Sequence, residues 1–207
     1  MDDGKLSHVM LNSVQSSKLV FDESRVIAAI NKLKDNLSAG PDAIPPLFFK
    51  HHKYCLAKSL ALLFTQMLSG GFVPSDWLRA IIVPVFKKGS AGIATNYRPM
   101  SLTCVASKVM ERIIAKALLQ HIVKNDLLSS AQHGFLKGKS TCTNLLKSHN
   151  DWTLSLQNKH GVTVVYIDFS KAVDSVSHKK LFVHLAQYGI CGNLLTRLEN
   201  FFTERSH

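Results

Sequence analysis

The chain has 207 residues, of which 46% are hydrophobic and 19% charged, so it can bury a core and is not a disordered chain. No apolar run approaches the roughly 18 residues of a membrane span, and no membrane partner is expected. The four cysteines form no C-x-x-C pattern, which excludes a disulfide framework or a zinc site and predicts the reduced thiols of an intracellular protein. The net charge of +11 favours polyanionic partners, of which nucleic acid is the commonest, although a solvated basic surface has the same composition.

The first third of the chain predicts helices. Residues 1–21 are expected to form a loose leader. Asp22 is placed to cap a helix that ends at the Gly40-Pro41 pair, and a longer helix runs from about residue 46 to Ser69. The apolar residues of the first helix fall on one face: Val26, Ile27, Ile30, Leu33 and Leu37.

The middle of the chain predicts a hairpin followed by a helix. Residues 81–86 form an apolar strand, and Pro84 restricts it to an edge because proline cannot donate to a sheet ladder. A hairpin-like loop spans 87–96, and residues 98–101 are extended because Arg98 precedes a proline. An amphipathic helix then runs to about Lys124.

The last third predicts a further helix, a strand and two short helices. Ser140 or Thr141 caps the first of these helices. The β-branched run 162–167 predicts a strand that ends in Asp168, and short helices follow over 179–188 and 194–202. The whole pattern predicts an α+β fold that is rich in helices and has a small sheet.

Asp168 is the first candidate for chemistry. A carboxylate at the end of a strand on a rigid sheet is well placed to hold a metal ion. An aspartate at such a place also caps turns, and the residue alone leaves both interpretations open. Asp174 is a second acid, whose direction the sequence does not define.

Two basic loops are further candidates. Lys87 and Lys88 lie at the tip of the predicted hairpin, and Arg98 lies on its returning arm, where the three cations could close over a triphosphate. The segment 132–141 mixes glycines, cations and hydroxyls with Phe135, which suits contact with a phosphate backbone. It lacks the spacing of a phosphate-binding P-loop. Each loop has a second interpretation as ordinary solvated surface.

The order of these segments resembles the reverse transcriptases of non-LTR retrotransposons, of the jockey-like or CR1-like kind. The resemblance covers roughly residues 22–205. It rests on segments 87–89, 96–102, 108–113, 132–135 with 139–141, and 166–178, together with the upstream stretch 38–45.

The resemblance implies a partial right-hand polymerase fold, with fingers and the beginning of the palm. The implied organisation is a leader over 1–21, a helical segment over 22–78, and the N-terminal part of a reverse transcriptase domain over 79–207. The family's enzymes copy an RNA template by adding dNTPs to a DNA primer, with two Mg²⁺ ions. Asp168 is then the first catalytic, metal-binding aspartate, and the carbonyl of Phe169 helps to hold a metal.

The resemblance also assigns roles to the basic loops. Lys87, Lys88 and Arg98 match fingers positions that neutralise the incoming triphosphate, and Val173 lies under the nucleotide sugar. The residues that match the template–primer segment are Gln132, Gly134, Phe135 and Lys139.

Three departures from the family pattern alter the expectation. Val173 replaces the usual phenylalanine, so exclusion of a ribonucleotide 2′-hydroxyl is weakened, and Leu136 stands where arginine is common. No Ala-Asp-Asp triplet, which supplies the other metal-binding carboxylates in the family, occurs in the sequence. By the resemblance, the family's thumb is not expected within these 207 residues. The chain alone is therefore expected to be inactive. The alternative is a non-catalytic, basic nucleic-acid-binding module, and a maturase-like relative is a weaker third hypothesis.

Overall fold

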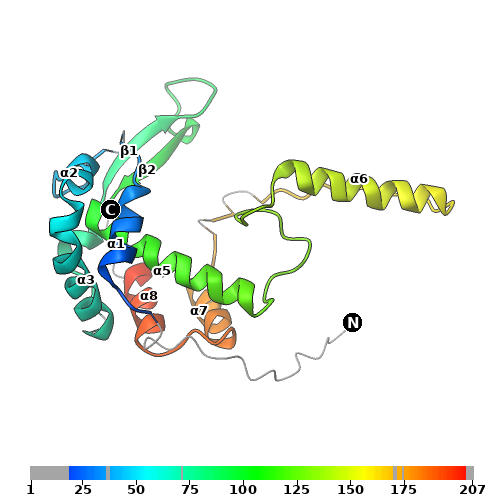
Figure 1. Ribbon diagram of the computed structural model, residues 1–207. Coiled ribbons are helices and arrows are strands. Elements are labelled where there is room, and N and C mark those ends of the chain that lie inside the picture. Colours follow the sequence, from blue (N-terminus) through cyan, green and yellow to red (C-terminus); the bar gives the residue numbers. More distant parts are fainter. Residues whose placement is uncertain (1–18, 36–37, 71, 170–171, 174, 204–207) are drawn as a thin grey trace. The chain divides into compact units, whose positions relative to one another are not determined.

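The computed structural model describes residues 19–35, 38–70, 72–169, 172–173 and 175–203, as helices joined by loops and one two-stranded hairpin (Figure 1). The chain divides into two compact units. The larger unit comprises Met1–His121 and His178–His207, and the smaller unit comprises Ile122–Ser177. Most of the expected leader lies outside the described residues. Leu19 and Phe21 are buried in the core, so residues 19–21 belong to the packed part of the chain.

Helix α1 (Glu23–Asn31) begins at the predicted cap. The carboxylate of Asp22 accepts hydrogen bonds from the Ser24 hydroxyl and the Arg25 backbone N–H, and these bonds lower the pKa of the carboxyl. The predicted end at Gly40 was wrong. The helix closes at Asn31 because the N–H groups of Lys32 and Leu33 bond three residues back, which tightens the last turn.

Gly40 has a packing role instead of ending the helix. A Cβ atom at this position would lie 2.5 Å from the backbone of Thr103 and Cys104, so only glycine allows the two chain segments to approach. Leu37, the last residue of the predicted apolar face, lies outside the described residues.

The long helix predicted over 46–69 is two helices, α2 (Pro46–His51) and α3 (Lys53–Gly70). They are separated at His52, whose backbone angles (φ −102°, ψ 15°) leave the helical region. Helix α3 packs against α1, and the short α4 (Ser75–Leu78) follows.

The predicted hairpin is confirmed. Strands β1 (Ile81–Phe86) and β2 (Tyr97–Leu102) pair antiparallel, with Ile81 opposite Leu102, and the short 3₁₀-helix η2 (Ala94–Asn96) precedes β2. Pro84 lies opposite Pro99, so the two residues that lack an N–H occupy one place in the ladder. Each strand of this sheet is an edge strand, as Pro84 requires.

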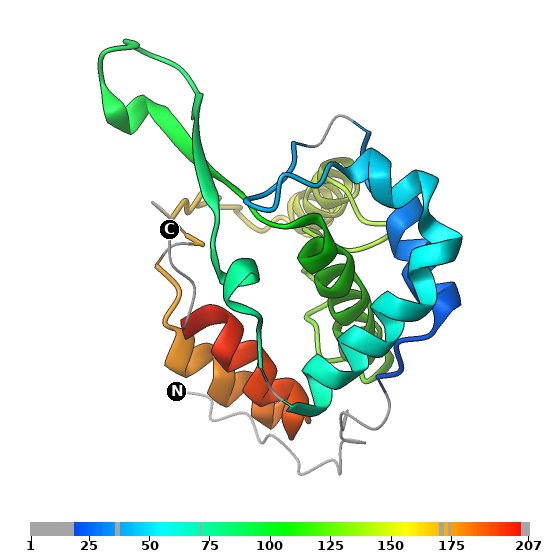
Figure 2. The same ribbon diagram turned by 90° about the vertical axis from the view of Figure 1, so that its left-hand side faces the viewer.

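Helix α5 (Val105–Lys124) as far as His121, together with α7 (His178–Gln187) and α8 (Asn193–Thr203), completes the larger unit. The core is built from α1, α3, α5 and the start of α8, where Ile30, Phe64, Val109 and Leu194 are fully buried. In Figure 2, α5 runs between the α1–α3 helices on one side and α7 and α8 on the other. No helix of the described residues is both long and apolar enough to cross a membrane.

Arg197 joins the elements of this unit from within. Its side chain is buried and donates hydrogen bonds to the Phe72 carbonyl (2.9 Å) and the Met110 sulfur (3.4 Å). Burial lowers the pKa of the guanidinium, and the nearby Glu111 opposes that shift. Arg197 therefore connects α8 to α5 and to the segment after α3.

The smaller unit contains α6 (Thr141–Gln157), and Ser140 is its cap. The strand predicted over 162–167 is wrong, since residues 161–169 have no regular secondary structure. A strand forms only with a hydrogen-bonded neighbour, and the one ladder of the described residues joins β1 to β2. Over the described residues, the fold is therefore helix-rich α+β with one two-stranded sheet.

Candidate active site

The predicted triphosphate cations lie on the hairpin of the larger unit. Lys87 follows β1 directly, Lys88 is the next residue in the loop, and Arg98 lies within β2 opposite Val85. All three side chains are exposed. No ion pair joins any of them to a carboxylate in the part of the chain that the structure describes. Their positive charge is thus available to an anionic ligand.

The loop that carries the two lysines is held by its own hydrogen bonds. The Lys87 N–H donates to the Asn96 carbonyl at 2.8 Å, and the Asn96 amide donates to the Ser90 carbonyl at 2.8 Å. The Tyr97 hydroxyl donates to the Ala91 carbonyl at 2.9 Å. Sequence reasoning missed Asn96 and Tyr97 as positioning residues, although an asparagine beside a Gly- and Ser-rich loop is a usual signal for such bonds.

The predicted template–primer residues form a connected loop in the smaller unit. The Gln132 side chain donates to the Gly134 carbonyl at 3.1 Å. Phe135 adopts a left-handed backbone conformation (φ 62°), and its side chain is fully exposed (101%). Lys139 is exposed beside Ser140. An exposed aromatic ring in a loop that carries exposed lysines has the composition of a surface on which bases stack.

A capping box fixes the end of this loop to α6. The Thr143 N–H donates to the Ser140 hydroxyl (3.2 Å), and the Ser140 N–H donates to the Thr143 hydroxyl (2.8 Å). A further hydrogen bond of 2.9 Å joins His133 Nδ1 to the same Thr143 hydroxyl. Burial lowers the pKa of His133, and Lys139 and Lys147 lower it further. His133 is thus favoured as a neutral ring that ties the loop to the helix.

Asp168 lies in the irregular segment 161–169, with an exposed side chain. It makes no hydrogen bond or ion pair within the described residues, and residues 170 and 171, which it would cap at a following turn, lie outside them. The side chains of Phe169 and Val173 are also exposed (73% and 84%). Asp174, the second acid noted in the sequence, lies outside the described residues.

The structure brings the candidate residues together in two groups. Lys87, Lys88 and Arg98 share the hairpin of the larger unit, whereas the template–primer loop and Asp168 belong to the smaller unit. Among the described residues, no three His, Cys, Asp or Glu side chains gather as a metal site would require. Asp168 therefore offers one carboxylate donor and does not form a complete metal site with its described neighbours.

Comparison with known proteins gives one family match. Residues 85–206 match the model for "Reverse transcriptase (RNA-dependent DNA polymerase)". The matched range includes the second half of the hairpin, the template–primer loop and Asp168.

The relatives come from mobile elements. The chain is 30% identical, over 76% of its length, to the probable RNA-directed DNA polymerase from transposon BS of Drosophila melanogaster. It is 29% identical, over 71% of its length, to the RNA-directed DNA polymerase from mobile element jockey of the same species. It is also 29% identical, over 61% of its length, to the Pol polyprotein from the type-1 retrotransposable element R2 of Popillia japonica. The matches span only 18%, 16% and 17% of these three relatives.

Proposed function

The chain belongs to the reverse transcriptase (RNA-dependent DNA polymerase) family and is a relative of the non-LTR retrotransposon enzymes, and from this premise we propose its part in polymerisation. The proposal is that it forms the fingers and the beginning of the palm of a right-hand polymerase. In that assembly it contributes to the extension of a DNA primer on an RNA template. The observation that carries the proposal is the hairpin, which presents three exposed cations without an ion pair among the described residues, all within the family match.

The hairpin cations bind the triphosphate of the incoming dNTP. Arg98 can contact phosphate oxygens bidentately, while Lys87 and Lys88 act as mobile point charges. The internal hydrogen bonds of the loop limit its motion, so less ordering entropy is lost when the nucleotide binds.

The family generally uses divalent metal ions, and the residues near Asp168 fit such an ion in part. The Asp168 carboxylate and the Phe169 carbonyl are hard oxygen donors of the kind that Mg²⁺ prefers. A bound ion would stabilise the charge that develops on the reacting phosphate. Because Asp168 stands without a second described carboxylate, further donors are required, and the 207 residues contain no Ala-Asp-Asp triplet to supply them.

Two assays test this proposal. A labelled dNTP, titrated with the 207-residue chain, should bind, and the K87Q/K88Q variant should lose about tenfold in affinity, a loss of about 1.4 kcal/mol. The matched control is K179Q/K180Q, two exposed lysines of α7, which should bind as the unaltered chain does. Equal losses in both variants would contradict a triphosphate site on the hairpin.

The second assay is primer extension on an RNA template with Mg²⁺ and dNTPs. We expect no extension by the chain alone, because Asp168 is the one family carboxylate among its described residues. Robust synthesis that D168N abolishes would overturn the proposed inactivity.

A second function, a non-catalytic nucleic-acid-binding module, is favoured by the net charge of +11. Binding of this kind weakens steeply with salt because counterions are released. A chain that binds RNA but shows no affinity for dNTPs would favour this module over the polymerase part.

A further inference from the structure

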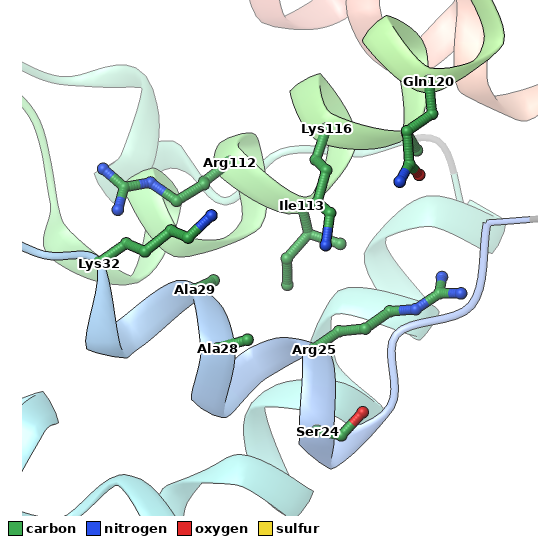
Figure 3. A pocket seen from close by; sticks show the side chains of 10 residues that line it. Ser24, Arg25, Ala28, Ala29, Lys32, Arg112, Ile113, Lys116 and Gln120 are labelled. Carbon is green, nitrogen blue, oxygen red and sulfur yellow. The ribbon is translucent and has the colours of Figure 1, made fainter. Parts of the chain in front are cut away.

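A pocket of about 330 Å³ lies between α1 and α5 of the larger unit, away from the hairpin cations (Figure 3). Neither the family match nor the sequence analysis assigns it a role. The residues that line it are Ser24, Arg25, Ala28, Ala29, Lys32, Arg112, Ile113, Lys116, Ala117 and Gln120.

Small side chains make the hollow. Ala28 and Ala29 on α1 and Ala117 on α5 leave space where two helices would otherwise meet through larger residues. Ala29 and Ile113 are buried and belong to the core, so the floor of the pocket is fixed by the packing of the unit. Arg112 and Lys116 point from α5 toward α1, and the Lys32 side chain extends alongside Arg112 (Figure 3).

The lining contains four cations and no carboxylate. Arg25 has a partner, since its Nε lies 3.2 Å from the Asp22 carboxylate. The side chains of Lys32, Arg112 and Lys116 form no ion pair or hydrogen bond within the described residues. Three like charges around one hollow repel each other, and an anion placed between them would relieve that repulsion.

The donors around the pocket suit a phosphate group. Arg112 can bind two phosphate oxygens with its planar guanidinium, and Lys32 and Lys116 add charge from either helix. Gln120 and Ser24 add neutral donors of the type that contact phosphate oxygens and sugars. The three unpaired cations are partly or fully exposed, so a strand could pass over the opening.

We infer that this pocket binds a phosphate of a nucleic-acid backbone, as an anchoring site separate from the triphosphate site. The choice of nucleic acid as the source of the phosphate rests on the proposed function. A contact to a phosphate carries no sequence information, so the site should hold single-stranded RNA and DNA without regard to sequence.

The test measures the affinity of the 207-residue chain for labelled RNA and DNA 20-mers of one sequence, in a series of salt concentrations. The K32Q/R112Q/K116Q variant removes three phosphate contacts. Because each contact to a single strand contributes about −0.7 to the salt slope, the slope should become less negative by about 2. At 0.1 M salt, this change in the salt slope predicts a loss of about a hundredfold in affinity for both the RNA and the DNA 20-mer.

The matched control is K58Q/K179Q/K180Q, which removes the same charge from exposed positions on α3 and α7. It should lose less than about threefold, because it removes long-range charge and no phosphate contact. Equal losses in the two triple variants would overturn the pocket, since net charge alone would then explain binding. A loss confined to RNA would overturn the phosphate assignment in favour of 2′-hydroxyl recognition.

A melting experiment separates a binding defect from a folding defect, and a charge-preserving variant tests whether charge explains the binding. The K32Q/R112Q/K116Q variant should melt at the same or a higher temperature, because it removes repulsion between like charges. The charge-preserving K32R/R112K/K116R variant should retain the salt slope, and a slope as shallow as that of the triple Gln variant would overturn the charge argument. Both variants should bind dNTP as the unaltered chain does, so failure of the pocket and failure of the proposed triphosphate site give different results.

Discussion

The two units of the chain hold their apolar residues in different ways. In the larger unit, α1, α3 and α5 bury their apolar faces in one core. In the smaller unit, α6 has no buried residue, and side chains such as Leu145, Leu146 and Leu156 are more than 60% exposed. Packing therefore maintains the larger unit, whereas local hydrogen bonds such as the Ser140 cap maintain the described helix of the smaller one.

The largest expected difference between the units is the cost of removing an apolar side chain. Phe64 is fully buried and meets the rings of Phe21 and Trp77 edge-on, so F64A should lower the free energy of unfolding by about 3–5 kcal/mol. L146A, at a position that is 64% exposed, should change it by less than about 0.5 kcal/mol. Urea unfolding followed by circular dichroism measures both. Similar losses at the two positions would show that α6 is packed as firmly as α3.

The next effect tests the buried cation of the larger unit. R197A removes two hydrogen bonds from a charged donor and leaves the Phe72 carbonyl without this partner, which should cost about 2 kcal/mol. K180A, at an exposed position on α7, is the control and should cost less than about 0.5 kcal/mol. The same urea experiment compares the two variants. An R197A variant as stable as K180A would show that the hydrogen bonds of Arg197 do not stabilise the larger unit.

A smaller effect is expected at the cap of α6. S140A removes the acceptor of the Thr143 N–H and should destabilise the first turn by about 1 kcal/mol. Amide hydrogen exchange in the first turn of α6 should accelerate about fivefold, while S155A, within the same helix, should leave that turn unchanged. Unchanged exchange in S140A would mean that other contacts fix the loop to the helix.

The smallest effect is a pH dependence in the template–primer loop. Because the pKa of His133 is lowered in the folded chain, the unfolded chain takes up this proton first as the pH falls below about 6.5. The stabilisation from the neutral ring is therefore present above that pH and is lost as the pH falls toward the lowered pKa. The difference in melting temperature between the unaltered chain and H133Q should shrink from pH 7.5 to pH 5.5. A difference that grows over this range would reverse the assigned direction.

Local signals in the sequence predicted most of the elements. Asp22 and Ser140 cap helices through bonds to residues close by in the chain, and Gly189, with φ at 81°, lies between the last two helices. The apolar run 81–86 predicted strand β1, and Pro84 predicted that this strand lies at an edge. These features depend on neighbours along the chain, which the sequence displays directly.

Features that depend on distant partners were harder to predict. The β-branched run 162–167 has the composition of a strand, but composition cannot supply the neighbouring strand that a ladder needs. The spacing of Arg112 and Lys116 places them on one face of α5, as the spacing of Arg25 and Lys32 does on α1. That the two faces line one pocket follows only from the tertiary arrangement of α1 and α5.

We propose that Asp168 supplies a catalytic carboxylate to a polymerase. The most direct test replaces the matching segment of the jockey RNA-directed DNA polymerase with residues 85–206 of this chain and measures primer extension on an RNA template. We expect the chimera to extend the primer. D168N should reduce its rate by at least about a hundredfold, while D151N, at an exposed position on α6, should leave the rate unchanged. A D168N chimera as active as the D151N chimera would contradict a catalytic role for Asp168.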